Sequence, residues 1–271
     1  MRLQRRWLLS NNVFYDLSAI NLALLGLAMF SSGFIDAIAG GGGLIQTPAM
    51  LLSFPNQNPV SVVATSKTAA FFGTSTAAIQ YRKSIKTDPR LLIAMVIPAF
   101  IGACFGALLA SHISAESFKS AIFFMMIAIF IYTLVKPDLG KVHVERHSPQ
   151  KLMVIGRIAA CLIGFYDGLI GPGTGTMLMI ALVAIMGFAF VGASAIAKVV
   201  NATTNLASII VVGIRIGFMW KLGLLLAIAN LIGGYLGSHM AIKKGSGFIR
   251  IFYLIVTGLL ILRLGYSLYI Q

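Results

Sequence analysis

The sequence has 271 residues and is too apolar for a soluble domain. Hydrophobic residues make up 58% of it and charged residues only 10%, with a mean hydropathy of +0.92. Soluble domains average about 45–50% apolar and about 25% charged residues. The apolar content is enough for many membrane crossings at roughly 20 residues each. We therefore expect an all-α polytopic membrane protein.

The chain is strongly basic, with 21 Lys and Arg against 7 Asp and Glu and a net charge of +14. A basic balance can indicate nucleic-acid binding, but that function needs a long basic face. Here the basic residues lie in short gaps between apolar runs, as at 82–90 and 136–151. Short basic loops are typical of the cytoplasmic side of membrane proteins. We therefore expect the lipid bilayer as a partner, and no nucleic acid.

Apolar runs follow one another along the chain and predict 8–10 helical segments. They cover residues 17–39, 44–54, 59–81, 91–111, 118–135, 152–170, 175–190, 192–212, 218–240 and 248–270. The runs at 44–54 and 175–190 are short, and each follows a cluster of glycines. Short segments interrupted by glycine or proline, at matching places in two halves, indicate broken or re-entrant helices.

One ungapped offset of 131 residues, the separation of Lys67 from Lys198, relates the two halves of the chain. The matches on this register are residues 33–36 with 164–167, Gly40 and Gly42 with Gly171 and Gly173, Lys67 with Lys198, and Gly102 and Gly106 with Gly233 and Gly237. Some glycine matches are expected by chance in a chain with 28 glycines. An aspartate and a lysine on the same register are much rarer, so we interpret the halves as a repeat.

The loop charges predict that the two repeats have opposite orientations in the membrane. Residues 82–90 carry four Lys or Arg, and their repeat mate 213–221 carries two. Residues 111–119 carry one, and their mate 242–250 carries three. Because basic loops favour the cytoplasmic side, the reversed bias predicts an inverted-topology repeat. Such repeats are common among secondary transporters.

The predicted domain organisation has four parts. They are a basic N-terminal tail at 1–20, transmembrane repeat 1 at 21–136, a cytoplasmic linker at 137–151 and transmembrane repeat 2 at 152–271. We expect each repeat to have about three full spanning helices plus a broken or re-entrant helix pair. The N-terminal tail disagrees with this topology. Inversion puts the N-terminus outside, whereas the arginines of the tail favour the cytoplasmic side.

The two glycine clusters, at 40–43 and 171–175, are candidate anion-binding breaks. Unwound backbone is tolerated in a membrane only where protein or water covers it. Freed N–H groups at the start of the following helix attract anions. The alternative is close helix packing through glycine, which we favour for the pairs at 102/106 and 233/237. The candidate substrate-binding residues are Gly40, Gly41, Gly42, Gly43, Gln46, Thr47, Lys67, Gly171, Gly173, Thr174, Gly175, Lys198, Asn201 and Asn205.

Four charged residues that match on the repeat register, namely Asp36, Lys67, Asp167 and Lys198, lie inside apolar runs. Asp36 and Asp167 should face a cavity or a partner, because a carboxylate within the membrane is costly. They are candidate proton carriers, or they support the breaks as ion-pair and helix-cap groups; a position near the interface is the alternative. Lys67 and Lys198 can neutralise an anionic substrate or pair with an aspartate. Their alternative is to extend to the membrane surface.

The sequence predicts no metal site and no cofactor. Cys104 and Cys161 both lie within apolar runs, and the chain has no CxxC motif, which argues against a disulfide framework or a zinc site. His143 and His147 are four residues apart in a polar loop without other candidate ligands. A zinc site needs about four ligands, so we interpret this loop as solvated.

The glycine clusters stand in two longer motifs, GFIDxIAGGGG at 33–43 and GFYDGxxGPGxG at 164–175. With these motifs, with Lys67 and with Lys198 and the segment 201–205, the chain resembles the sulfite exporter (TauE/SafE) family of bacterial membrane permeases. The resemblance covers residues 20–268. It implies export of sulfite, organosulfonates or related anions across the inner membrane, and it does not fix the substrate.

The favoured hypothesis is a permease that exports small sulfur-containing or carboxylate anions by alternating access, and not an enzyme. An anion channel is one alternative. An intramembrane aspartyl protease using Asp36 and Asp167 is another, supported by the two aspartates and by the Tyr166–Asp167 pair. It is disfavoured because the second aspartate lacks a Gly-x-Gly-Asp setting and because both aspartates precede a glycine break. A glycine break that is repeated in both halves suits a two-fold transport site better than it suits a protease active site.

Overall fold

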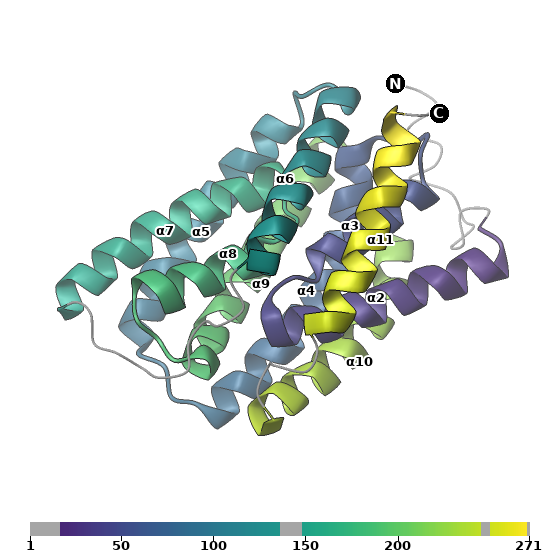
Figure 1. The fold of residues 1–271 in the computed structure, drawn as a ribbon. Helices are drawn as coiled ribbons and strands as arrows, with labels where there is room; N and C mark the ends of the chain where they lie inside the picture. Colours follow the sequence, from purple (N-terminus) through teal and green to yellow (C-terminus); the bar gives the residue numbers. More distant parts are fainter. Residues whose placement is uncertain (1–16, 136–147, 245–249, 270–271) are drawn as a thin grey trace.

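A computed structural model of the chain describes residues 17–135, 148–244 and 250–269 (Figure 1). These residues form helices and connecting turns, with no strand among them. The helices are α2 (Ala19–Ala39), α3 (Gly43–Ser53), α4 (Pro59–Ser84), α5 (Pro89–Ala110), α6 (Ala115–Val135), α7 (Pro149–Leu169), α8 (Thr174–Ile180) with a following π-helical turn (Ala181–Ile185), α9 (Phe190–Arg215), α10 (Trp220–Lys244) and α11 (Arg250–Tyr269). Most of the predicted tail and linker, with His143 and His147, lies outside the described residues.

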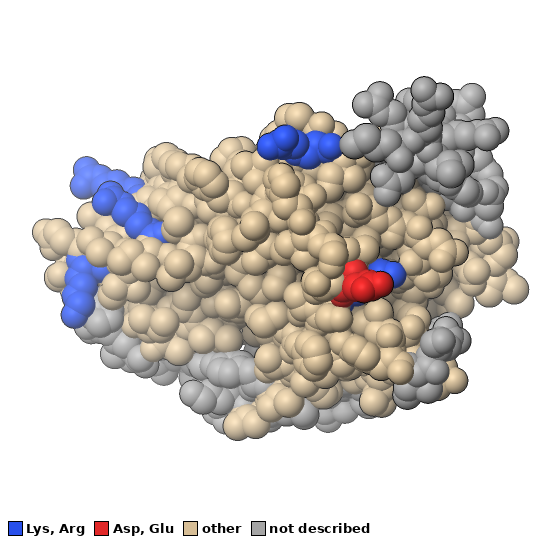
Figure 2. All heavy atoms as spheres, turned by 90° about the horizontal axis from the view of Figure 1, so that it is seen from above, with Lys and Arg blue, Asp and Glu red and all other residues tan. Residues whose placement is uncertain are grey.

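Five of the described helices are long and apolar enough to cross a membrane, namely α2, α5, α7, α9 and α10. This confirms the prediction of an all-α polytopic membrane protein. Helix α4 has 26 residues, the same length as α9, but serines, threonines and Lys67 make it more polar. Figure 2 shows one face of the molecule, on which charged side chains are confined to a few places.

Proline and a capping side chain start several of the long helices. Helix α4 begins at Pro59, and the Asn58 side chain accepts a hydrogen bond of 2.9 Å from the N–H of Val60. Helix α5 begins at Pro89, and Asp88 accepts from the N–H of Arg90 at 2.9 Å. Proline suits the first helical position because it has no N–H to leave unpaired. These caps allow the chain to reverse within a few residues at the ends of the long helices.

The helix boundaries follow the 131-residue register found in the sequence. Helices α4 and α9 correspond at both of their ends, and α3 and α8 begin at corresponding residues. The long helices also pack in a crossed manner: α2 lies against α10, and α7 lies against α5 (Figure 1). Each half of the chain therefore packs its first helix against the other half.

Glycine allows these crossed helix pairs to approach closely. A β-carbon at Gly106 of α5 would collide with the carbonyl oxygen of Phe165 in α7. One at Gly237 of α10 would collide with the carbonyl oxygen of Phe34 in α2. Close backbone contact through small residues is a common way for helices to associate in membranes. The structure thus agrees with our interpretation of these glycine pairs as packing surfaces.

Both predicted breaks are present. The break between α2 and α3 contains Gly40, whose φ of +82° is a left-handed conformation that suits glycine. The break between α7 and α8 contains Gly171 and Gly173, with φ of +97° and +83°. The helices that follow are short, with 11 residues in α3 and 7 in α8. The glycine clusters therefore interrupt the helices as the sequence predicts.

Replacing Gly106 with valine should destabilise the protein, because the added side chain forces α5 away from α7. Overpacking of this kind costs about 1–3 kcal/mol. The measurement is the midpoint of thermal unfolding in detergent. Gly26→Val is the matched control, since a β-carbon at Gly26 meets nothing within 4 Å. Equal midpoints for the two variants would contradict the packing role of Gly106.

Candidate functional site

Two buried ion pairs lie at the centre of the molecule, and each joins the two halves of the chain. Lys198 Nζ of α9 is 3.1 Å from Asp36 Oδ2 of α2. Lys67 Nζ of α4 is 3.1 Å from Asp167 Oδ2 of α7. The exposed fraction is 1% for the Lys198 side chain and 12% for that of Asp36, and the other two are also buried. The lysines therefore do not extend to the surface.

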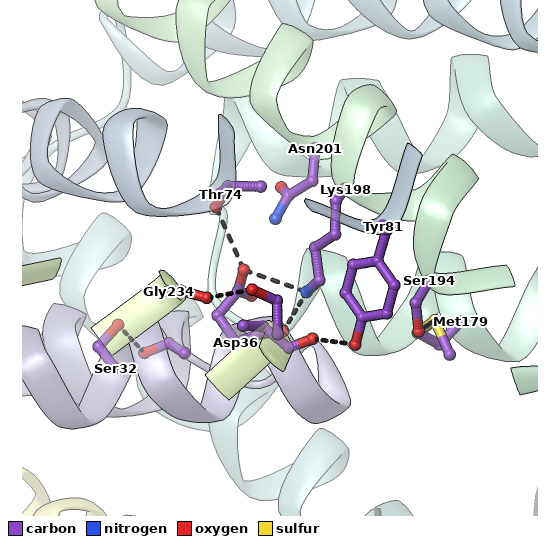
Figure 3. A network of polar contacts seen from close by, with 12 residues as sticks. Ser32, Asp36, Thr74, Tyr81, Met179, Ser194, Lys198, Asn201 and Gly234 are labelled. Carbon is purple, nitrogen blue, oxygen red and sulfur yellow. Dashed lines mark hydrogen bonds and ion pairs between the residues drawn. The ribbon is translucent and has the colours of Figure 1, made fainter. Parts of the chain in front are cut away.

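Each lysine also binds the end of the helix that carries its aspartate. Lys198 donates to the backbone carbonyl of Asp36 as well as to its carboxylate (Figure 3). Lys67 likewise donates to the backbone carbonyl of Asp167, and it forms an ion pair with the carboxylate of that residue. These carbonyls lie in the last turns of α2 and α7, where the helix dipole favours a positive charge. The lysines thus stabilise both the buried carboxylates and the helix ends at the breaks.

Hydroxyl groups complete the surroundings of the two carboxylates. Thr74 donates to Asp36 Oδ2 at 3.1 Å, and Thr174 donates to Asp167 Oδ1 at 2.7 Å. Lys67 has a further acceptor in Ser208 Oγ at 3.0 Å. Within the described part of the chain, Asp167 Oδ2 makes no hydrogen bond, although it lies against the Lys67 ammonium. This oxygen is the least satisfied atom of the two pairs.

A small polar cavity lies between the ion pairs and the two glycine breaks. The centre of a water molecule can occupy about 30 Å³ of it, which is room for two or three waters at about 10–15 Å³ each. The cavity is lined by Ser32, Asp36, Gly40, Gly43, Gln46, Thr47, Lys67, Ala70, Thr74, Asp167, Gly171, Gly173, Thr174, Gly175, Asn201, Asn205 and Asn230. In this conformation the site is too small for a sulfonate.

The two breaks meet beside this cavity. A β-carbon on Gly40 would collide with the backbone of Gly175, and one on Gly175 would collide with Gly40. The first residues of the two short helices, Gly43 and Thr174, both line the cavity. The structure therefore brings the two glycine clusters together from positions far apart in the sequence.

The backbone N–H groups at the start of α3 are less available than the sequence suggests. The N–H groups of Leu44, Ile45 and Gln46 all donate to glycine carbonyls within the turn itself. The Thr174 N–H likewise donates to the carbonyl of Gly171 at 3.3 Å. Side-chain amides, hydroxyls and Lys67 must therefore supply much of the hydrogen bonding in the cavity.

Most of the predicted site residues line the cavity, but three do not. The predicted residues in its wall are Gly40, Gly43, Gln46, Thr47, Lys67, Gly171, Gly173, Thr174, Gly175, Asn201 and Asn205, together with Asp36 and Asp167. Gly41 is buried away from it. Gly42 packs against Ser32 and the Asp36 side chain. Lys198 is paired with Asp36 and does not reach the cavity wall.

Four residues of the cavity wall were missed by the sequence analysis, namely Ser32, Ala70, Thr74 and Asn230. Ser32 donates to Gln46 Oε1 at 2.9 Å, and Asn230 donates to the same oxygen at 3.3 Å. Room for Asn230 comes from Gly33 and Gly73, because a β-carbon at either would collide with it. A polar residue inside an apolar run is the signal that identifies Asn230 and Ser32.

The sequence matches the family model described as "Sulfite exporter TauE/SafE" over residues 25–264. The chain belongs to this family. A "Probable membrane transporter protein ORF9" from Sinorhizobium sp is 36% identical over 92% of this chain and 94% of the relative. A "Probable membrane transporter protein" from Haemophilus influenzae is 34% identical over 93% and 97%. No solved structure matches the chain.

A third relative, the "Probable membrane transporter protein YfcA" of Escherichia coli K12, is 32% identical over 94% of each chain. The TauE/SafE family and these relatives identify the protein as a membrane transporter, and not an enzyme. The site geometry agrees. Paired catalytic aspartates of proteases share a proton at close range, whereas Asp36 and Asp167 here each pair with a lysine.

Proposed function

We propose that this TauE/SafE-family transporter is a permease of the bacterial inner membrane that exports small anions by alternating access. Sulfite, organosulfonates and related sulfur-containing or carboxylate anions are the substrate class. The observation that carries the proposal is Lys67, a buried cation in the wall of a polar cavity built from both halves of the chain. A desolvated anion needs such a cation and several hydrogen-bond donors to replace its lost water.

We further propose that residues 21–136 and 152–271 are inverted repeats, related by a pseudo-two-fold axis in the membrane plane. The shared helix boundaries and the crossed ion pairs support this arrangement. The reversed loop charges support it independently. Alternating access then follows from rocking one repeat against the other around the central site.

The substrate anion competes with Asp167 for Lys67. In the present conformation the Asp167 carboxylate forms an ion pair with the Lys67 ammonium. The cavity beside this pair has room only for a few waters. When the cavity widens, an anion can take the place of the carboxylate on Lys67. The amides of Asn201 and Asn205 and the hydroxyl of Thr47 then complete its hydrogen bonding. Gln46 and the glycines at 40, 43, 171, 173 and 175 line the same space.

Displacement of Asp167 couples the anion to a proton. A carboxylate that has lost its cation in a low-dielectric site is costly and takes up a proton instead. Asp167 Oδ2 is suited to this, because it makes no hydrogen bond among the described residues. One proton then crosses with each anion, so export proceeds where the outward gradient of the anion exceeds the inward gradient of protons. Lys198 and Asp36 are placed to hold the α2 break together during this exchange, with Lys198 adding positive potential behind the site.

An anion channel is the remaining alternative, and the small size of the cavity, which has room only for a few waters, favours a carrier over it. A carrier shows saturable counterflow, in which unlabelled substrate inside vesicles accelerates uptake of labelled substrate. A channel does not. Proteoliposomes loaded with sulfite, thiosulfate, an alkanesulfonate or a carboxylate test both the mechanism and the substrate. Absence of counterflow with every anion, together with anion conductance, would reject the carrier.

Replacing both members of the Lys67–Asp167 ion pair, in Lys67→Met/Asp167→Asn, should slow anion uptake roughly tenfold to hundredfold while keeping the protein folded. The double change leaves no unpaired charge, and it removes an interaction worth roughly a tenfold to hundredfold change in rate. Uptake of the best substrate in proteoliposomes is the measurement, with size-exclusion profiles to check folding. Lys86→Met, at an exposed position, is the control and should transport normally. Normal uptake by the double variant would place the site elsewhere.

Asp167→Asn should separate anion movement from proton movement. An alkanesulfonate is the appropriate substrate, because it stays ionised at every pH used. For one proton per anion, steady-state uptake in the unaltered protein should rise about tenfold for each pH unit by which the outside is more acidic. The asparagine variant cannot carry a proton, so its uptake should not depend on the gradient. A gradient response equal to that of the unaltered protein would exclude Asp167 as the carrier.

A further inference from the structure

A second hollow lies along the seam between α4 and α9. These two helices also line the central cavity, but with different faces. It is lined by Phe71, Ser75, Ala78, Ile79, Arg82, Lys83, Val199, Ala202, Thr203 and Leu206, and we call it the seam groove. The centre of a water molecule can occupy about 460 Å³ of it, many times the space in the central cavity. It therefore has room for a large ligand.

The length of the seam groove matches one leaflet of a bilayer. Phe71 lies one helical turn beyond Lys67, near the middle of α4, and Arg82 lies in its last turn. The eleven residue steps from Phe71 to Arg82 correspond to about 16 Å of helix. Half of a hydrocarbon core of about 30 Å is about 15 Å. The groove thus extends from the depth of the ion pairs to the depth of the headgroups.

The walls of the groove are mostly apolar, with Ser75 and Thr203 as their polar residues, and its outer end is basic. Ile79 is 56% exposed and Leu206 38% exposed, so both present apolar surface outside the packed core. Arg82 and Lys83 are exposed at the end of α4, and neither forms an ion pair with a carboxylate of the described residues. An elongated apolar surface with two exposed cations at one end complements a lipid with an anionic headgroup.

The basic end is present on one side of the seam only. In the repeat register, the residues that correspond to Arg82 and Lys83 are Gly213 and Ile214 near the end of α9. Arg215 follows them but does not line the groove. The repeat therefore provides two similar helices, but the cations of the groove stand at one end of one of them. A ligand recognised by these cations would occupy a single leaflet.

We propose that the seam groove binds one anionic phospholipid. Its phosphate lies between Arg82 and Lys83, and an acyl chain runs along Ile79, Leu206 and Phe71 towards the middle of the membrane. The lipid fills the space between the two helices that carry Lys67 and Lys198, on a face that the substrate does not use. This site is separate from the transport site and does not depend on the proposed substrate.

Native mass spectrometry of the detergent-purified protein tests the proposal, with phosphatidylglycerol or phosphatidylcholine added. The unaltered protein should retain one phosphatidylglycerol and exchange phosphatidylcholine freely. In Arg82→Gln/Lys83→Gln the affinity for phosphatidylglycerol should fall roughly 25-fold, at about fivefold for each basic residue near the headgroup. Lys86→Gln/Arg90→Gln is the matched control, since it removes two exposed cations at the same end that do not line the groove.

Three results would overturn the proposal. Equal loss of lipid from the two double variants would show general attraction by basic loops. Displacement of the lipid by inorganic phosphate at millimolar concentration would show a site for a free anion. A dimer that is cross-linked through cysteines at position 79 would show that a second copy of the chain covers the seam. Restored retention in Arg82→Lys/Lys83→Arg, which keeps both charges, would support the lipid site.

Discussion

The cost of burying charge in a membrane protein governs the centre of this structure. An unpaired ion in a low-dielectric interior costs several kcal/mol, and four ionisable side chains lie together here. Each aspartate satisfies this constraint with a lysine from the other half of the chain. Separating the halves would expose both pairs at once. The ion pairs therefore hold the two halves together at the place where the transport site is formed.

The same lysines explain why the broken helices are stable. Helices α2 and α7 end inside the protein, where their last carbonyl groups need partners. Lys198 and Lys67 donate to the carbonyls of Asp36 and Asp167, in addition to forming ion pairs with their carboxylates. If a substrate anion draws Lys67 away from Asp167, one helix end loses part of its support. Substrate binding and movement of the α7 break are thereby linked through a single ammonium group.

Apolar runs in the sequence were sufficient to predict the helices, and the glycine clusters predicted the breaks. The repeat identified the four central charges, because it placed an aspartate and a lysine at equivalent points of both halves. It could not show that each lysine pairs with the aspartate of the opposite half, since a linear register carries no information on contacts between halves. Asn230 and Ser32 were missed for a related reason. Their repeat mates are apolar, Ala99 and Ile163, so the repeat gave no signal for them. The sequence also could not show which backbone N–H groups at the starts of α3 and α8 form hydrogen bonds within the turns, because these bonds depend on the folded backbone.

The central claim is that the ion pairs cross between the halves, and the thermal stability of matched double variants tests it most directly. Lys67→Met alone strands a buried carboxylate and should cost about 3–5 kcal/mol. Adding Asp167→Asn, the crossed partner, should recover most of that loss. Adding Asp36→Asn instead should recover nothing and destabilise the protein further, because it strands Lys198. The account would be contradicted if Asp167→Asn and Asp36→Asn restored the stability of Lys67→Met equally. It would also be contradicted if only Asp36→Asn restored it.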